Sequence, residues 1–452
     1  MKQVAIPAEL FVANRQRLVA RLVPNSVTVV NSNDVMPTNA DGTMGHHQNA
    51  DLFYFTGIRQ EESILLLAPN AFEEKNREVL FIREPSEHLA IWEGHKYSKE
   101  EATAVSGIKT VKWLSEFRGF FHATMCENEH VYLNSNEHPR ASVEVQSRDA
   151  RFVQECKARY PLHQYHRLAR LMHELRVVKS PQELELIRKA CAITHDGFLR
   201  VAKFVKPGVN ESDVEAEFAH EFIRQRGGFA YPPIIAAGEN NCVLHYVSND
   251  QPCKAGQLLL LDVAAGYGNY MSDLTRTIPV SGRFTRRQKE VYRAVLRVFR
   301  TLIGEMRPGV LTRDLRKRAE ELTTKECVDL GLLKPSQVRK QDPDNPAVGK
   351  YFMHGVAHPL GLDVHDLGLP QMPMQPGWVL TMEPGIYIKE EGFGIRLEND
   401  VLITETGNVD LMADIPIEPE EIEELMSGKT MRPTKGAKED TKEHEGIRKQ
   451  KH

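Results

Sequence analysis

The sequence has few cysteines, no long apolar run and no excess of charge of one sign. Its six cysteines lie far apart, with neither the paired spacing of a zinc ribbon nor the density of a secreted disulfide scaffold. Apolar runs such as 64–68 and 258–261 are too short to span a bilayer, and no charged stretch followed by an apolar segment opens the chain. We therefore expect a cytoplasmic protein with reduced thiols and no membrane partner.

The balance of charge says little about partners. The 58 Lys and Arg residues against 62 Asp and Glu residues give a formal net charge of -4. A chain so close to neutral gives no reason to expect a nucleic acid or an anionic membrane as a partner.

The length predicts two domains, because 452 residues exceed what one hydrophobic core usually supports. In the first part, helix-like segments alternate with strand-like runs at 27–30, 63–67, 79–82 and 131–133. This alternation predicts an α/β domain over residues 1–170. Ser180-Pro181-Gln182-Glu183 then has the residues of a capped helix start, and we assign residues 171–426 to the second domain. Residues 427–452 are rich in Lys, Glu, Thr and Gly, which predicts a charged, disordered tail.

The second part contains an internal repeat. Lys206-Pro207-Gly208-Val209 recurs as Arg307-Pro308-Gly309-Val310, and each segment predicts a turn that leads into a helix. Further on in each half, a glycine precedes an apolar strand that reaches a carboxylate six residues later, at Asp262 and at Glu383. Two similar halves, each with a helix followed by a carboxylate-bearing hairpin, indicate a pseudo-symmetric domain with its site between the halves.

Each hairpin pairs two acidic residues in the expected register. With the first turn centred on Tyr267-Gly268, Asp262 faces Asp273. With the second turn at Glu390-Glu391, Glu383 faces Glu398. Facing carboxylates repel each other, and acids are rare within strands, so two such pairs indicate four carboxylates around cations. A bulge could move one side chain to the other face, and the ordinary place for an acid is a solvated face.

Oxygen-rich ligation suits Mn²⁺, with Zn²⁺, Co²⁺ or Fe²⁺ as further candidates. Two ions that share carboxylates lie about 3.5 to 4 Å apart, bind a substrate oxygen and generate hydroxide near neutral pH. Three histidines, His354, His358 and His365, lie in the glycine-containing stretch before Glu383. One imidazole can complete a metal shell, and the others can bind or protonate reacting groups. His245 precedes Asp262 much as His365 precedes Glu383, so it is the expected counterpart in the first half.

These residues resemble the pita-bread metallopeptidases, in particular the branch that holds aminopeptidase P (Xaa-Pro aminopeptidase) and prolidase. The likeness runs from about residue 6 to 424 and rests on His245-Tyr246, Asp262, Asp273-Leu274-Thr275-Arg276-Thr277, the stretch from His354 to Asp366, Met382-Glu383-Pro384-Gly385 and the stretch from Gly394 to Asp400. In the first domain, the stretch from Gln48 to Gly57 and Ile91-Trp92-Glu93-Gly94 resemble aminopeptidase P more than prolidase. The resemblance implies an α+β fold: a C-terminal pita-bread domain with a pseudo-twofold repeat, preceded by a smaller α/β domain.

The resemblance also implies a set of roles. It makes five residues the ligands of two divalent metal ions: Asp262, Asp273, His358, Glu383 and Glu398. Glu383 would also handle the proton of a bridging hydroxide, while His245, His354 and His365 would contact the substrate. Arg396 and Tyr387 would support the site, and Trp92, from the same or a neighbouring subunit, would form a wall of the proline pocket. The implied reaction removes the first residue of a peptide whose second residue is proline, in a homodimer or homotetramer.

Other functions remain open at this point. A prolidase would cleave only Xaa-Pro dipeptides and would need extra positive charge or a closed end for the terminal carboxylate. A non-catalytic binding module on the same fold, or a metal-free enzyme of the creatinase type, fits less well because the five expected ligands are all present.

Overall fold

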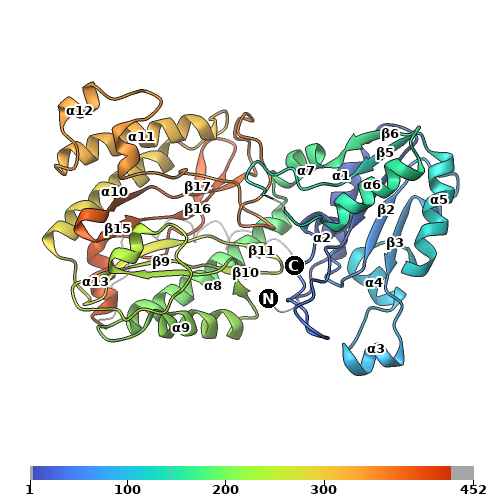
Figure 1. Ribbon diagram of the computed structural model, residues 1–452, viewed down its shortest axis with the longest axis horizontal. Helices are drawn as coiled ribbons and strands as arrows, with labels where there is room; N and C mark the ends of the chain where they lie inside the picture. Colours follow the sequence, from blue (N-terminus) through green and yellow to red (C-terminus); the bar gives the residue numbers. More distant parts are fainter. Residues whose placement is uncertain (1–3, 143, 429–452) are drawn as a thin grey trace, which may run out of the picture.

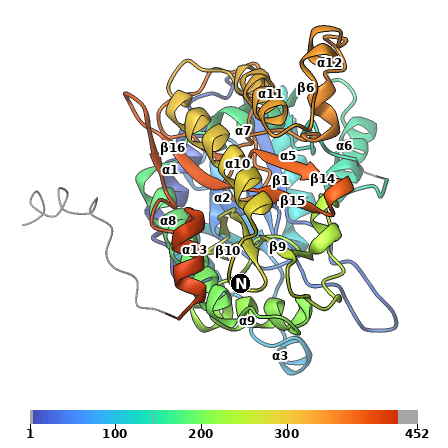
Figure 2. The same cartoon turned by 90° about the vertical axis from the view of Figure 1, so that its left-hand side faces the viewer.

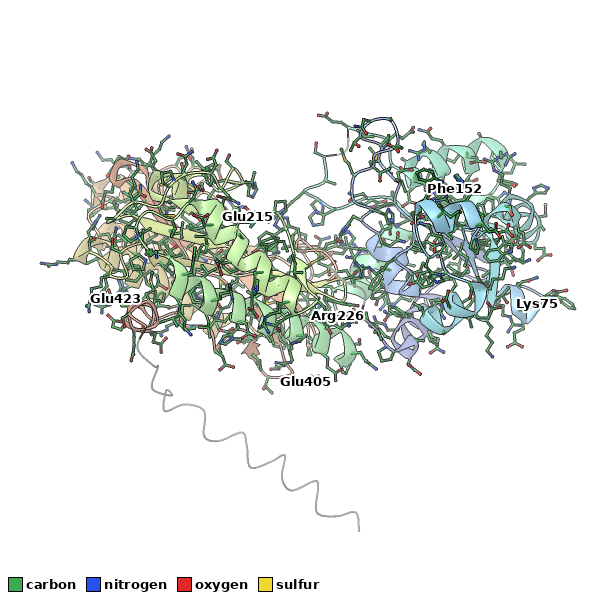
Figure 3. The ribbon with its side chains drawn as sticks, turned by 90° about the horizontal axis from the view of Figure 1, so that it is seen from below. Lys75, Phe152, Glu215, Arg226, Glu405 and Glu423 are labelled. Carbon is green, nitrogen blue, oxygen red and sulfur yellow. The ribbon has the colours of Figure 1, made fainter. Side chains whose placement is uncertain are left out.

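The computed structural model describes residues 4–142 and 144–428, and these form two lobes (Figure 1). The expected tail over 427–452 lies almost entirely outside the described residues. Seen from below, Lys75 and Phe152 mark one lobe, Glu215 and Glu423 mark the other, and Arg226 lies near the junction (Figure 3). None of the helices in the described ranges is both long and apolar enough to cross a membrane.

The first lobe contains a six-stranded mixed sheet in the order β4-β3-β2-β1-β5-β6. Its strands are β1 (Ser26–Asn31), β2 (Ile64–Leu67), β3 (Glu78–Ile82), β4 (Thr110–Trp113), β5 (His130–Leu133) and β6 (Gln164–Arg167). The four strand-like runs expected from the sequence are therefore confirmed as β1, β2, β3 and β5.

Helices cover both faces of this sheet, which explains its continuous apolar strands. Val27 and Val29 of β1 pack toward α5 (Phe117–Glu127) and α6 (Arg148–Arg159), whereas Val30 packs toward the opposite face. That face is covered by α1 (Ala8–Val19), α2 (Ala50–Thr56) and α4 (Lys99–Ser106), while the short α3 (Glu87–Trp92) projects at the lower edge of the lobe (Figure 1).

The second lobe consists of two copies of one structural unit. In the first half, α8 (Pro181–Phe204) and α9 (Glu211–Arg224) are joined by a turn in which Gly208 has φ of 98°. In the second half, α10 (Arg286–Glu305) and α11 (Thr312–Asp329) are joined by a turn in which Gly309 has φ of 91°. The repeat is therefore confirmed, and Ser180 caps α8 as expected, with Glu183 completing a capping box.

Short strands follow each helix pair and form the inner layer. The first half contributes β7 (Gly228–Phe229), β8 (Ile234–Ala237), β9 (Leu258–Asp262), β10 (Ala265–Tyr267), β11 (Tyr270–Met271) and β12 (Thr275–Pro279). The second half contributes β13 (Val379–Met382), β14 (Gly385–Ile388), β15 (Phe393–Arg396), β16 (Asn399–Ile403) and β17 (Asn408–Asp410). The remaining helices are α7 (Leu168–Arg176), α12 (Pro335–Arg339) and α13 (Pro419–Met426). Helices α9, α10, α11 and α13 lie around the outside of these strands (Figure 2).

The two hairpin predictions had different outcomes. In the second hairpin the expected register is confirmed, because Ile388 pairs with Phe393 and Met382 with Asn399, which leaves Glu383 opposite Glu398 between the paired stretches. In the first hairpin it is wrong, because Asp262 pairs with Thr275.

The physical reason for the error is the turn of the first hairpin. Gly268 and Asn269 both have positive φ, 57° and 69°, so the two-residue turn is centred one residue later than expected. Moving the centre of the turn by one residue moves the cross-strand partner of each residue by two positions. Side chains two positions apart on a strand point to the same face of the sheet, so Asp273 stays on the face of Asp262. Asp262 and Asp273 are therefore diagonal neighbours on one face, and the conclusion that they converge does not depend on the register error.

The apolar side chains on the α1, α2 and α4 face of the six-stranded sheet form one continuous core with those of the second lobe. Leu168, Met172 and Leu175 of α7 belong to this core. The domain limits 1–170 and 171–426 stay a prediction.

Candidate metal centre and active site

Three side chains from both halves of the repeat meet in the second lobe. Asp273, His358 and Glu398 each offer one ligand atom, and these atoms all lie within 4.8 Å of one another. All three residues are buried. The structure thus brings together a set of donors that could hold a metal ion.

Two more carboxylates border this cluster. His358 Nε2 lies 3.5 Å from Asp273 Oδ2 and 3.7 Å from Glu383 Oε1. Asp262 ends β9, and its Oδ1 atom is buried without a hydrogen-bond partner among the described residues. The five residues expected as ligands are therefore close together in the structure.

A single bridge between the halves places Glu398. Its main-chain N–H donates to the carbonyl of Thr275 at 3.1 Å, and the Thr275 hydroxyl donates back to Glu398 Oε2 at 2.7 Å. Thr275 begins β12 of the first half, whereas Glu398 lies between β15 and β16 of the second. This link fixes the Glu398 carboxylate of the second half against the strand that follows Asp273 in the first half.

The carboxylates have unusual proton affinities. Burial, followed by the charge of neighbouring carboxylates, raises the pKa of Asp273 and of Glu398 well above their usual values. Burial also raises the pKa of Glu383 to about 7, with Arg396 opposing and Asp262 adding to the shift. So many buried acids would be costly without cations, and one Asp262 oxygen is buried with no hydrogen-bond partner among the described residues. The donor set therefore fits divalent metal ions.

His358 is arranged as a ligand rather than as a cation. Its Nδ1 atom lies 3.0 Å from the carbonyl oxygen of Pro359, which fixes the proton there and leaves the Nε2 lone pair directed at the carboxylates. Burial, followed by the neighbouring His365, lowers the pKa of His358 to about 3. The imidazole is thus neutral at physiological pH.

A chain of hydrogen bonds joins His354 to Asp262. His354 Nε2 lies 2.9 Å from the Tyr387 hydroxyl, which accepts from Arg396 Nη1 at 2.9 Å. Arg396 also donates to Asp262, and from Nε to the Thr275 hydroxyl at 3.0 Å. Burial, followed by the charge of Arg396, lowers the pKa of His354 to about 3, so its ring is neutral as well.

The other predicted residues lie at the open side of the site or away from it. His365 is exposed and its ring meets that of His358 edge to face, with centroids 4.5 Å apart. His245 is exposed and near enough to lower the pKa of both His354 and His365, after burial and nearby arginines. Trp92 is 74% exposed on α3 of the first lobe and is not among the residues that line the site within one chain.

Three supporting residues were missed from the sequence: Tyr231, Asp400 and Thr275. The Tyr231 hydroxyl donates to Asp273 Oδ1 at 2.6 Å, and Asp400 Oδ2 accepts from the main-chain N–H of Asp273 at 3.0 Å. No local pattern pointed to Tyr231. Thr275, two residues after Asp273 and on the same strand face, could have been found from the period of a strand.

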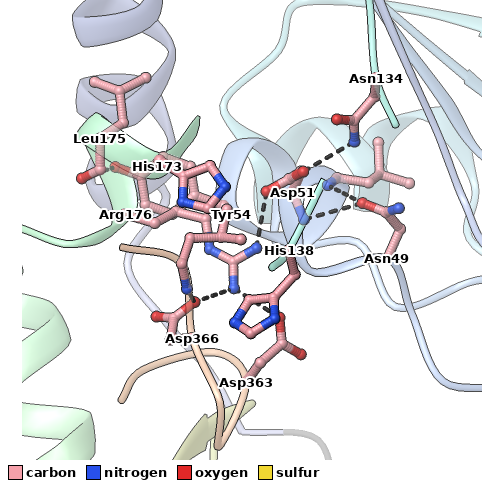
Figure 4. A network of polar contacts seen from close by, with 12 residues as sticks. Asn49, Asp51, Tyr54, Asn134, His138, His173, Leu175, Arg176, Asp363 and Asp366 are labelled. Carbon is pink, nitrogen blue, oxygen red and sulfur yellow. Dashed lines mark hydrogen bonds and ion pairs between the residues drawn. The ribbon is translucent and has the colours of Figure 1, made fainter. Parts of the chain in front are cut away.

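A buried ionic network anchors the histidine-bearing loop to the first lobe (Figure 4). Arg176 of α7 donates to Asp51 of α2 at 2.8 Å, to Asp363 at 2.7 Å and to Asp366. Lys179 also donates to Asp366, at 3.2 Å. Asp363 and Asp366 flank His365, so α7 fixes the loop that carries His358 and His365.

Comparisons with known proteins place the chain among peptidases. The model of metallopeptidase family M24 matches residues 185–405, and that of the aminopeptidase P N-terminal domain matches residues 11–132. Xaa-Pro aminopeptidase of Escherichia coli is 33% identical over 93% of this chain and 98% of its own length. Human Xaa-Pro aminopeptidase 3 is 33% identical over 89% of this chain and 81% of its own, and human Xaa-Pro dipeptidase is 30% identical over 96% and 97%.

Solved structures agree with these relatives. Zn-substituted E. coli aminopeptidase P in complex with product has a TM-score of 0.83 at 33% identity, covering 95% of this chain and all of its own. An aminopeptidase of Pseudomonas aeruginosa has a TM-score of 0.84 at 29% identity, covering 94% and 99%. The second lobe therefore has the expected pita-bread fold, and the enzymes of this family use divalent metal ions. The chain belongs to metallopeptidase family M24, with the N-terminal domain and overall fold of its aminopeptidase P members.

Proposed function

We propose that this chain is an Xaa-Pro aminopeptidase, a hydrolase that cuts the bond between the first residue of a peptide and a following proline. The observation that carries the proposal is the convergence of three carboxylates from both halves, Asp273, Glu383 and Glu398, on His358. Asp262 lies near these carboxylates, and the exposed His245 and His365 border the site. Relatives named Xaa-Pro aminopeptidase that align over nearly the whole chain support the same reaction.

In this proposal the five converging residues hold two divalent ions: Asp262, Asp273, His358, Glu383 and Glu398. Four carboxylates and one imidazole suit Mn²⁺, while Zn²⁺, Co²⁺ and Fe²⁺ accept the same donors. When bound, such ions supply Lewis acidity and make water a nucleophile near neutral pH.

The protein's own groups position the substrate and move protons. Glu383 has the more accessible side chain, 17% exposed against 7% for Asp273, and its two oxygens lie 3.7 Å from His354 and from His358. Glu383 can thus accept the proton that water releases as its oxygen adds to the scissile carbonyl carbon. When the C–N bond breaks, the same proton passes to the proline nitrogen, which has no hydrogen of its own in the peptide.

The histidines and their supports complete the site. His245 and His365, on the open side, contact the substrate around the scissile bond and the proline. His354 is held by Tyr387, and Tyr387 by Arg396, so these residues keep the imidazole neutral and oriented. A groove of about 500 Å³ leads from His365 toward the first lobe, which leaves room for residues after the proline and favours an aminopeptidase over a dipeptidase.

The test compares three peptides with the Mn²⁺-loaded protein: Xaa-Pro-Yaa-Zaa, Xaa-Pro and Xaa-Ala-Yaa-Zaa. We expect release of the first residue from the tetrapeptide with proline and little release from the one with alanine. Cleavage of the dipeptide alone would make the protein a prolidase. Absence of cleavage together with absence of bound Mn, Zn, Co or Fe would make it a binding module.

We also propose that the protein forms a homodimer or homotetramer in which Trp92 reaches the site of a neighbouring copy. Ile91 and Trp92 are 79% and 74% exposed, side by side on α3. Light scattering gives the molar mass in solution, and a monomer at working concentrations would contradict the proposal.

A further inference from the structure

A segment of the first lobe reaches the catalytic site. After β5, residues 134–140 leave the six-stranded sheet and run toward the loop that carries His358 and His365. Asn134 anchors the start of this segment by donating to Asp51 at 2.9 Å, within the network around Arg176 (Figure 4). The segment therefore has a fixed origin next to the histidine loop.

His138 fixes the other end of the segment. Its Nδ1 atom accepts from the main-chain N–H of Arg140 at 3.1 Å, and its ring also hydrogen-bonds to the main chain of Asp366. Asp366 is itself held by Arg176 and Lys179. The backbone of Arg140 is thus tied, through His138, to the loop of His365.

The guanidinium of Arg140 points at the rim of the site. Its Nη2 atom would lie 3.8 Å from a Cβ atom placed on Gly355, next to His354. His138 and Arg140 also line a cavity of about 120 Å³ together with His358 and His365.

Arg140 has no acidic partner in the described part of the chain. Its only hydrogen bond there is made by its main-chain N–H, and no carboxylate lies within 4.0 Å of its guanidinium. Asp363 and Asp366, which lie near His138, are already bound by Arg176 and Lys179. An unpaired guanidinium at the mouth of a peptide-binding groove is suited to a carboxylate, with which it can form two parallel hydrogen bonds.

We propose that Arg140 is a specificity-determining residue that binds the C-terminal carboxylate of tripeptides of the type Xaa-Pro-Yaa. This inference rests on the proposed aminopeptidase function. Two extended residues beyond the scissile bond span about 7 Å, which takes a tripeptide's carboxylate out of the metal centre and toward its rim. A longer peptide passes the same point with an uncharged amide and gains less from the guanidinium.

The test combines one substitution in the enzyme with one modification of the substrate. Ala-Pro-Ala and its C-terminal amide are compared as substrates of the wild type and of Arg140→Gln, with Mn²⁺ present. For the wild type we expect amidation to lower kcat/KM about tenfold, mainly through KM, because a hydrogen bond to a charged group at a partly exposed site contributes at the lower end of its usual range. For Arg140→Gln we expect the acid and the amide to be cleaved at similar rates.

A matched control is Arg118→Gln, another exposed arginine of the first lobe, on α5 and absent from the site lining. This variant should keep the tenfold preference for the free carboxylate. Binding of the product-like dipeptide Pro-Ala and of its amide, measured by calorimetry, gives a readout that does not depend on turnover, and only the acid should lose affinity in Arg140→Gln.

The outcomes distinguish a failure of the proposed role of Arg140 from a failure of the proposed aminopeptidase function. If the wild type cleaves Ala-Pro-Ala but Arg140→Gln slows the acid and the amide equally, or changes neither, the role of Arg140 is overturned while the aminopeptidase function stands. If the wild type cleaves no peptide with proline in the second position, the function itself is overturned, and the role of Arg140 with it.

Discussion

Arg396 on β15 donates a hydrogen bond to Asp262 at the end of β9, and this contact joins the second half of the repeat to the first at the metal centre. The same guanidinium binds the Thr275 and Tyr387 hydroxyls. One planar side chain thus holds Asp262 directly and reaches Glu398 through the Thr275 hydroxyl.

Replacing Arg396 by lysine should therefore impair the reaction more than the fold. Lysine keeps the charge but cannot bind the three partners in one plane, so His354 and Asp262 lose their common support. We expect kcat/KM for Xaa-Pro-Yaa-Zaa to fall about 100-fold, given the usual worth of hydrogen bonds to charged groups. Arg293→Lys, an exposed arginine on α10, serves as the control. An Arg396→Lys enzyme with wild-type kcat/KM would refute this role.

Arg176 should contribute a large part of the free energy that stabilises the junction of the two lobes. Its replacement by methionine leaves Asp51, Asp363 and Asp366 buried or half-buried with too few cations. Breaking a buried ion pair costs about 3 to 5 kcal/mol, which corresponds to a fall in Tm of roughly 10 °C. Arg170→Met, an exposed change on the same helix α7, should leave Tm within about 2 °C. A Tm for Arg176→Met equal to that of the wild type would contradict the network's importance.

The metal-free protein should lose stability as the pH rises above 6.5. The three histidines of the site have lowered pKa values, so above their ordinary value of 6.5 they are neutral in the folded and unfolded states and contribute no further change. Glu383, with a pKa raised by burial to about 7, still holds a proton there that the unfolded chain has released, and burial raises the pKa of Asp273 and of Glu398 in the same direction. A folded state that binds more protons is destabilised as pH rises.

Melting curves of EDTA-treated protein between about pH 6.5 and pH 8 test whether the metal-free protein loses stability as the pH rises. We expect Tm to fall by several degrees over that range, and the fall to vanish with saturating Mn²⁺, because cations favour the ionised carboxylates. A metal-free Tm that rises with pH over this range would show that the acids are not gathered as described.

The strands and the repeat were predictable because their signals are local. Apolar runs bounded by turns gave β1, β2, β3 and β5, and the two Lys/Arg-Pro-Gly-Val turns gave the paired helices. Acids within apolar strands are unusual enough that two pairs of them pointed to the part of the structure where Asp273, His358 and Glu398 form a cluster. The first hairpin was placed wrongly because Gly268 and Asn269, rather than Tyr267 and Gly268, form the turn, and both adopt the left-handed conformation.

The rest of the site depends on contacts between segments distant in the sequence. Tyr231 reaches Asp273 across 42 positions, and Arg176 reaches Asp366 across 190. Arg140 approaches Gly355 from another lobe, and no periodicity within either segment encodes that approach. Trp92, expected as a wall of the proline pocket, lies exposed on α3, so its role stays a prediction that concerns a second copy of the chain.

The most direct test of the metal centre measures bound metal and peptide cleavage together in Asp273→Ala and Glu398→Ala. Both side chains are buried in the cluster with His358, so each change removes a donor that would hold the proposed ions. After loading with Mn²⁺ and desalting, we expect less than half of the wild-type metal content and a loss of Xaa-Pro cleavage greater than about 100-fold, beyond what loss of an outer support costs. Asp344→Ala, an exposed acid in a loop, should match the wild type in both. Wild-type metal content and cleavage in either buried variant would contradict the account.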